Sequence, residues 1–168
     1  MILSIEEARK KYSDAHIESD AHIESGAHIA SGAYIGSGAY IGSGAYIGSG
    51  ANIASGAYIR SDAHIASGAY IGSGAHIASG AYIGSGAHIG LNRKNVRHAI
   101  AIHSSLSYPF TAFDCDDGVI ITLGCLNEYR GDIPEKAREF VLEKESNKIE
   151  LFDIAIKLAL KYFEEVKK

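Results

Sequence analysis

A six-residue unit decides the fold of this chain, and it is most regular in residues 31–48, which read SGAYIG-SGAYIG-SGAYIG. The unit recurs thirteen times, without insertion or deletion, from Ser13 to Gly90. In every unit an alanine and an isoleucine stand two positions apart, with tyrosine, histidine or asparagine between them. Because residues two apart on a strand share a face, the alanines and isoleucines are predicted to point inward and the residues between them outward.

The second position of the unit marks the corner between strands. It is glycine in ten units and aspartate in three, at Asp14, Asp20 and Asp62. Glycine, and less readily aspartate, adopt the positive φ angles of tight turns. A strand and a bend every six residues wind the chain into a coil, and a three-sided coil has 18 residues in each turn. The sequence therefore predicts a three-sided parallel β-helix of about four turns.

The repeat Ile-Gly-Ser-Gly-Ala-Tyr, kept in phase over residues 13–90, resembles the hexapeptide-repeat, left-handed parallel β-helix family of the bacterial transferase type. This resemblance implies a left-handed coil and assembly as a homotrimer. Many members transfer acyl groups from acetyl-CoA or acyl carrier protein in clefts between subunits, with a histidine as general base. Those enzymes usually interrupt the coil with a loop, and no loop interrupts this repeat.

The chain divides into three predicted segments within a mainly β fold. Residues 1–12 form an N-terminal capping helix, because Ser4-Ile5-Glu6-Glu7 is a capping box. Residues 13–90 form the β-helix. Residues 91–168 form an α+β segment for capping or oligomerisation, in which two β-rich runs, 108–115 and 119–125, flank a turn at 116–118 and make a hairpin. This last segment resembles C-terminal regions of uncharacterised bacterial and phage-associated proteins.

Two helices are predicted after the hairpin, one capped by Asp132 and one opened by Asn147. The second helix has two apolar stripes, although a peripheral helix needs only one. We expect one stripe to meet the end of the β-helix or a neighbouring subunit. The stripes are Leu151, Ile154, Leu158 and Tyr162, and Phe152, Ile156, Leu160 and Phe163.

Adding 18 to a residue number moves one rung up the same wall, which predicts three outward columns. No histidine lies directly above another histidine in any column, so neither a metal site nor a carbonic-anhydrase-type zinc site is predicted. The columns are His16, Tyr34, Asn52, Tyr70 and His88; His22, Tyr40, Tyr58 and His76; and His28, Tyr46, His64 and Tyr82.

The outward walls carry few charges, since Arg60 and Asp62 are the only charged residues between Glu24 and Arg93. Flat walls rich in tyrosine favour packing against copies of the same chain, and the family resemblance implies that this assembly is a homotrimer. They can also stack a planar ligand, and a basic cluster after the repeat can contact its phosphate. The candidate ligand-binding residues are Tyr34, Tyr40, Tyr46, Tyr58, Tyr70, Tyr82, Arg93, Lys94 and Arg97.

Composition excludes several partners. A net charge of −4 argues against nucleic acid as the main partner. No apolar run approaches the roughly 20 residues of a membrane-spanning helix. Two cysteines, Cys115 and Cys125, are too few for a disulfide framework and lie too far apart in the hairpin to bond. We expect reduced thiols and a cytoplasmic location.

Three functions are considered. Near-identical rungs favour a non-catalytic homotrimeric scaffold or assembly module without a cofactor, which is the main prediction. The first alternative is a protein that sequesters a small molecule or nucleotide in its subunit clefts. The second is an acyltransferase with acetyl-CoA as donor. For that enzyme the candidate bases are His98 and His103, which lie outside the repeat.

Overall fold

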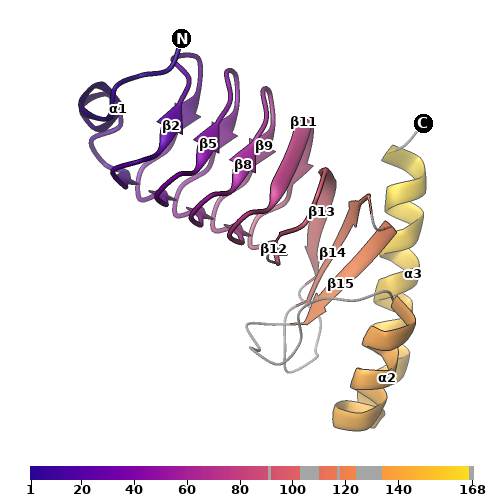
Figure 1. Ribbon diagram of the computed structural model, residues 1–168. Helices are drawn as coiled ribbons and strands as arrows, with labels where there is room; N and C mark the ends of the chain where they lie inside the picture. Colours follow the sequence, from indigo (N-terminus) through magenta and orange to yellow (C-terminus); the bar gives the residue numbers. More distant parts are fainter. Residues whose placement is uncertain (91, 103–109, 117, 124–133, 167–168) are drawn as a thin grey trace.

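The computed structural model describes residues 1–90, 92–102, 110–116, 118–123 and 134–166. Its body is a parallel β-solenoid that leads from helix α1 (Ile5–Lys11) to a small sheet and two helices at the other end (Figure 1). The rungs are mostly two-residue strands: β1 (His16–Ile17), β2 (His22–Ile23), β3 (His28–Ile29), β4 (Tyr34–Ile35), β5 (Tyr40–Ile41), β6 (Tyr46–Ile47), β7 (Asn52–Ile53), β8 (Tyr58–Ile59), β9 (His64–Ile65), β10 (Tyr70–Ile71), β11 (His76–Ile83) and β12 (His88–Ile89).

The strands stack into three walls with the predicted 18-residue period. The first wall has the order β1-β4-β7-β10-β12. The second runs β2-β5-β8-β11 and the third β3-β6-β9-β11, because the long strand β11 turns a corner and serves both walls. Registers such as His16 opposite Tyr34 confirm the outward columns expected from the sequence. The three-sided β-solenoid is therefore confirmed.

The interior of the solenoid is built from the alanines and isoleucines, as predicted. From Ala33 to Ile89 these residues are buried in every unit. Backbone bonds join successive rungs; for example, the Tyr34 amide donates to the Ala51 carbonyl at 2.9 Å. Each rung thus buries its apolar face and satisfies its backbone against the next rung, which is what holds so short a strand in place.

The bends also follow the sequence. From Gly32 to Gly86 the second-position glycines have φ between 65° and 73°, and Asp62 has φ of 60°. This region of backbone space suits glycine and tolerates aspartate. The first three units, at Asp14, Asp20 and Gly26, do not adopt a positive φ, and nothing in the structure explains that difference.

Helix α1 covers the N-terminal end of the solenoid. The predicted capping box is confirmed, since the Ser4 side chain accepts from the Glu7 amide and the Glu7 side chain accepts from the Ser4 amide. Arg9 donates from Nε and Nη2 to the Ile17 carbonyl, at 2.9 and 2.7 Å, and so joins α1 to the first rung. Helix α1 thereby partly covers the strand edge that the first rung would otherwise expose.

The wall does not stop where the repeat stops. Strand β13 (Val96–Ile102) pairs in parallel with β11, and β14 (Phe110–Cys115) and β15 (Gly118–Leu123) continue the same sheet in antiparallel order. The pairing of Cys115 with Gly118 confirms the predicted hairpin and its turn. The segment after Gly90 thus extends one wall of the solenoid.

The C-terminal sheet lies between the solenoid core and the helices. Phe113, Cys115 and Ile120 join the solenoid core, whereas Ala112 and Ile121 on the opposite face pack with the helices. The helical elements are α2 (Pro134–Glu145), the 3₁₀ turn η1 (Ser146–Lys148) and α3 (Ile149–Val166). The sheet therefore caps the end of the prism, and the helices cover the sheet.

Two expectations about the last helix need correction. In the stripe that contains Phe152 and Phe163, all members except the exposed Leu160 are buried on the outer face of the C-terminal sheet, and so meet neither the end of the prism nor a neighbouring subunit. Asn147 was expected to open the last helix. It lies instead within the 3₁₀ turn η1, and α3 begins two residues later, at Ile149. Asp132 and Cys125 lie outside the described residues.

Candidate functional site

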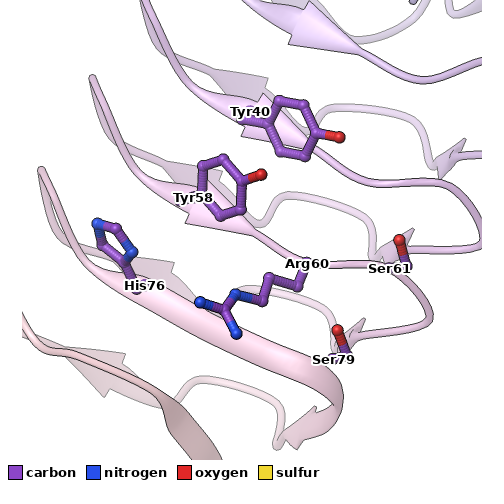
Figure 2. Close-up of a pocket in the computed structure, with 6 residues that line it drawn as sticks. All are labelled: Tyr40, Tyr58, Arg60, Ser61, His76 and Ser79. Atoms are coloured by element: carbon purple, nitrogen blue, oxygen red, sulfur yellow. The ribbon is translucent and has the colours of Figure 1, made fainter. Parts of the chain in front are cut away.

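A groove of about 400 Å³ lies on the second wall and runs across three successive rungs. Figure 2 shows rings from neighbouring rungs one above the other, with the Arg60 side chain extended along the wall toward His76. The 18-residue period brings these side chains together, since β5, β8 and β11 are consecutive strands of one wall. Its lining residues are Tyr40, Tyr58, Arg60, Ser61, His76 and Ser79.

The floor of the groove is a stack of aromatic rings. The Tyr40 and Tyr58 rings are 4.3 Å apart between centroids and nearly parallel, at 6°. The His76 ring continues the stack at 5.6 Å from Tyr58, with an interplanar angle of 24°. Because each ring covers a face of the next, the column presents ring edges, and these edges form an apolar shelf against which a planar group can pack.

Arg60 gives the groove its positive charge. Its side chain is exposed and lines the groove next to two serine hydroxyls. Gly42, one rung below, allows the close approach of this rung: a Cβ on Gly42 would lie 2.6 Å from the Ser61 nitrogen and 2.9 Å from the Arg60 carbonyl carbon. An arginine in this position can donate several hydrogen bonds to a phosphate or carboxylate.

Tyr40 is held in place and does not exchange its proton readily. Its hydroxyl donates to Oε1 of Glu24, whose other oxygen accepts from the Ser43 amide at 2.8 Å. The hydrogen bond from Tyr40, followed by that from Ser43, lowers the pKa of Glu24, and the same bond to Glu24 raises the pKa of Tyr40. Because the Tyr40 hydroxyl is held by Glu24, His76 is the side chain of the groove that offers a ring nitrogen as a general base.

The structure does not gather the six candidate tyrosines into one site. Only Tyr40 and Tyr58 meet in the groove. Tyr34 and Tyr70 belong to the first wall, where Tyr34 donates to Glu18 at 3.1 Å and Tyr70 stacks on His88. Two others, Tyr46 and Tyr82, are exposed on the third wall on either side of His64.

The basic cluster lies at the C-terminal sheet and does not line the groove. Arg97 forms two hydrogen bonds of 2.9 Å with the Asp114 carboxylate and a further contact with Asp116. The Arg93 guanidinium lies 5.9 Å from the centroid of the Phe113 ring. Lys94 is exposed. Because carboxylates already occupy the Arg97 guanidinium, the phosphate contact expected of this residue has no support.

The two candidate bases outside the repeat also lie away from the groove. His98 is half-buried on β13, in register with Asp114 of β14. His103 lies outside the described residues. Sequence reasoning selected neither Arg60 nor His76 for the site. The available signals were the near absence of charge along the walls, which singles out Arg60, and the 18-residue step that places His76 above Tyr58.

Within the described ranges, no group of three or more histidine, cysteine, aspartate or glutamate side chains is arranged to hold a metal ion. Nor does any helix in the same ranges have the length and apolar character needed to cross a membrane. The groove is therefore the strongest candidate site that the described residues provide.

The repeat matches a known family model. Residues 14–49 fit the model described as bacterial transferase hexapeptide (six repeats). These residues are similar to the hexapeptide repeats of bacterial transferases. The family resemblance expected from the sequence is confirmed for the repeat, whereas the resemblance of the C-terminal segment to phage-associated proteins stays untested. No curated protein matches the chain.

Solved structures with a similar fold were also found. The acetyltransferase domain of PglB from Neisseria gonorrhoeae in complex with acetyl coenzyme A is 22% identical, with a TM-score of 0.32, and the match covers 51% of this chain and 50% of that one. The same domain without this ligand gives 21% identity and a TM-score of 0.31, over 49% and 53% of the two chains. This chain thus spans about half the length of the Neisseria domain it matches.

A third structure is from Bacillus cereus and is provisionally assigned as an acetyltransferase. It is 16% identical with a TM-score of 0.29, and the match covers 86% of this chain and 92% of that one. At these identities and TM-scores, the three likenesses carry no argument about the activity of this chain.

The main prediction from the sequence, a non-catalytic scaffold, is wrong by the comparison with family models. The model that fits the repeat is a transferase model, which agrees better with the acyltransferase alternative. The scaffold prediction assumed rungs without any specialised position. One wall in fact differs from the others, because Arg60 and His76 flank a ring shelf in a groove.

Proposed function

We propose that this protein is an acyl-CoA-dependent acyltransferase and that the groove over Tyr40, Tyr58 and His76 forms one side of its active site. The observation that carries the proposal is that one wall holds a histidine, an arginine and a flat ring shelf within a single groove. The match of residues 14–49 to bacterial transferase repeats supports the same reaction class. The resemblance to the hexapeptide family supplies acetyl-CoA as the donor.

The proposed reaction moves an acyl group from a thioester to a hydroxyl or amine. His76 accepts the proton of the acceptor as its oxygen or nitrogen attacks the thioester carbonyl carbon. The carbon–sulfur bond breaks, and His76 returns the proton to the departing thiol. Arg60 donates hydrogen bonds to a phosphate of the donor, and its adenine packs against the ring edges of the Tyr40 and Tyr58 shelf.

The proposal includes self-association as a homotrimer. The groove is open, so a second side is needed to exclude water from a thioester. In the family that the repeat resembles, a neighbouring subunit supplies that side. We further propose a cytoplasmic location, because two cysteines are too few for a disulfide framework.

The test combines calorimetry with acetyl-CoA and a thiol-release assay with a panel of sugar and amine acceptors. His76→Asn should lower turnover by about 10²–10⁴-fold, the usual contribution of a general base, while acetyl-CoA affinity stays nearly unchanged. Arg60→Gln should weaken acetyl-CoA binding by about tenfold, because a charge-assisted hydrogen bond contributes roughly 1.5 kcal/mol or more.

His64→Asn is the matched control, since His64 and His76 both stand in the sequence Ala-His-Ile-Ala-Ser but only His76 lines the groove. This variant should keep wild-type turnover. If the His64 and His76 variants behave alike, or if the wild type does not bind acetyl-CoA, the proposal fails. Saturable ATP or ADP binding without turnover would favour the nucleotide-sequestering alternative.

A further inference from the structure

Helix α3 carries an apolar stripe that the described part of the chain leaves uncovered. Leu151, Ile154 and Leu158 follow one another at helical spacing and are 46%, 58% and 62% exposed. Five of the nine large hydrophobic side chains found exposed in the described residues lie on α2 and α3. A continuous apolar stripe of this kind marks an interaction surface.

The other sides of α3 are already occupied. Phe152, Ala159 and Phe163 are buried on the face toward the C-terminal sheet. Arg138 of α2 bonds to both oxygens of Asp153, at 2.6 and 2.8 Å, and so fixes α2 along a second side of the helix. The stripe lies on a third side, where another helix could pack without displacing either neighbour.

We propose that this stripe pairs with the same stripe of a second copy of the chain, with the two α3 helices antiparallel about a two-fold axis. In such an isologous contact, every contact between two different residues occurs twice, once on each side of the axis. The stripe has the alternating spacing of three and four residues used in helix pairs, which allows Leu151 to pack opposite the partner's Ile154, and Ile154 opposite the partner's Leu151. Leu158 then lies at the end of the contact, beside the partner's η1 turn. This inference does not depend on the proposed function of the groove.

Charge complementarity selects the second copy and this register. Glu150 and Lys157 border the stripe on the same side; both are exposed, and neither has an ion-pair partner among the described residues. With Leu151 opposite the partner's Ile154, position 150 of each helix lies beside position 157 of the other. Glu150 therefore lies beside the partner's Lys157, and Lys157 beside the partner's Glu150.

Other arrangements lack this match. An antiparallel register shifted by one heptad places Lys157 beside the partner's Lys157 and Glu150 beside the partner's Glu164, so that every flanking pair repels. A parallel arrangement places Ala155 and Tyr162 beside the two charged residues, without any opposite charge. The charges of α3 thus favour one antiparallel self-pairing over its competitors.

Charge-swap variants of the full chain test the proposal in sedimentation equilibrium. Glu150→Lys and Lys157→Glu each turn both attractive pairs into repulsive ones, and each should raise the dissociation constant of α3 pairing about tenfold at low salt. The double variant E150K/K157E should restore wild-type affinity. Ile154→Glu should abolish the pairing and halve the mass, whatever assembly the solenoid walls make.

The outcomes are distinct. If all four variants keep the wild-type mass, or if the double variant does not regain what the single variants lose, the proposal is overturned. Another segment of the same chain could instead cover the stripe. Ile154→Glu would then lower the melting temperature without changing the mass, which would also overturn the proposal. Because the substituted residues are all exposed, each variant should keep its helices, and circular dichroism checks this.

Discussion

At the residue scale, histidines with the same local sequence, Ala-His-Ile, have different surroundings. The His76 ring lies at the end of the shelf in the groove, whereas the His64 ring lies between Tyr46 and Tyr82, tilted by 49° and 46°. His88 stacks on Tyr70, and its amide donates to the Thr111 hydroxyl of β14 at 2.8 Å. Burial at this junction lowers the pKa of His88.

The lowered pKa of His88 predicts a pH-dependent stability. The folded protein binds this proton less tightly than the unfolded chain, whose histidine titrates near 6.5. The contribution of His88 to stability is therefore complete above that pH and is lost as the pH falls below it. As the pH falls from about 7.5 to about 5, the urea midpoint of His88→Gln should decline less steeply than that of the wild type. Exposed His22→Gln is the control and should keep the wild-type slope, and equal slopes for both variants would contradict the prediction.

At the scale of the element, some glycines lie so close to the next rung that the nearest atoms of that rung belong to its backbone. Gly42 illustrates this, because its missing Cβ would meet the backbone of Ser61 and Arg60 in the next rung. A bend glycine such as Gly56 is different: it has open space around it but a φ of 68°. The two positions of the hexapeptide unit that these glycines occupy thus serve two purposes: the last position allows close packing, and the second allows the chain to bend.

Gly42→Ala should therefore destabilise the solenoid by about 1–3 kcal/mol through overpacking, and should move the rung that carries Arg60. Under the proposed function, this shift weakens acetyl-CoA binding, which calorimetry measures beside the urea midpoint. Gly56→Ala should cost about 1–2 kcal/mol through its backbone conformation while acetyl-CoA affinity stays unchanged. Equal affinities of the two variants would show that Gly42 does not position the groove.

At the scale of the whole molecule, the repeat and the C-terminal segment share one sheet and one core. Strand β13 joins β11 to the hairpin, and Phe113 reaches into the solenoid core. Between β13 and β14 lies an ion pair in which the Asp114 side chain is 2% exposed and the Arg97 side chain 39%. This pair, whose carboxylate is buried, contributes to holding the cap on the prism.

Arg97→Met should lower the free energy of unfolding by about 2–3 kcal/mol, because it removes the bidentate partner of a buried carboxylate. The matched control is Arg138→Met, which breaks an arginine–aspartate pair with side chains 46% and 42% exposed and should change stability little. Urea unfolding followed by circular dichroism measures both variants. Similar losses in the two would refute the role of burial.

The sequence predicted most of the fold because the repeat constrains it locally. Alternation of Ala33 and Ile35 about Tyr34 fixes which side faces inward, and the glycine bends fix the period, so the columns followed by arithmetic. The capping box at Ser4 and the hairpin turn at Gly118 are likewise local signals. The candidate site was less predictable, since six tyrosines look equivalent in sequence and only two of them share the groove.

The sequence by itself thus determined the rung, its period and the wall to which each side chain belongs, because these depend on contacts that recur every six and eighteen residues. Only the tertiary structure decided that His76 shares a groove with Arg60 while half-buried His88 contacts β14, and that β13 to β15 cap the prism. These features arise where the periodic wall meets a segment of different sequence, and no repeating pattern specifies how two such surfaces pack.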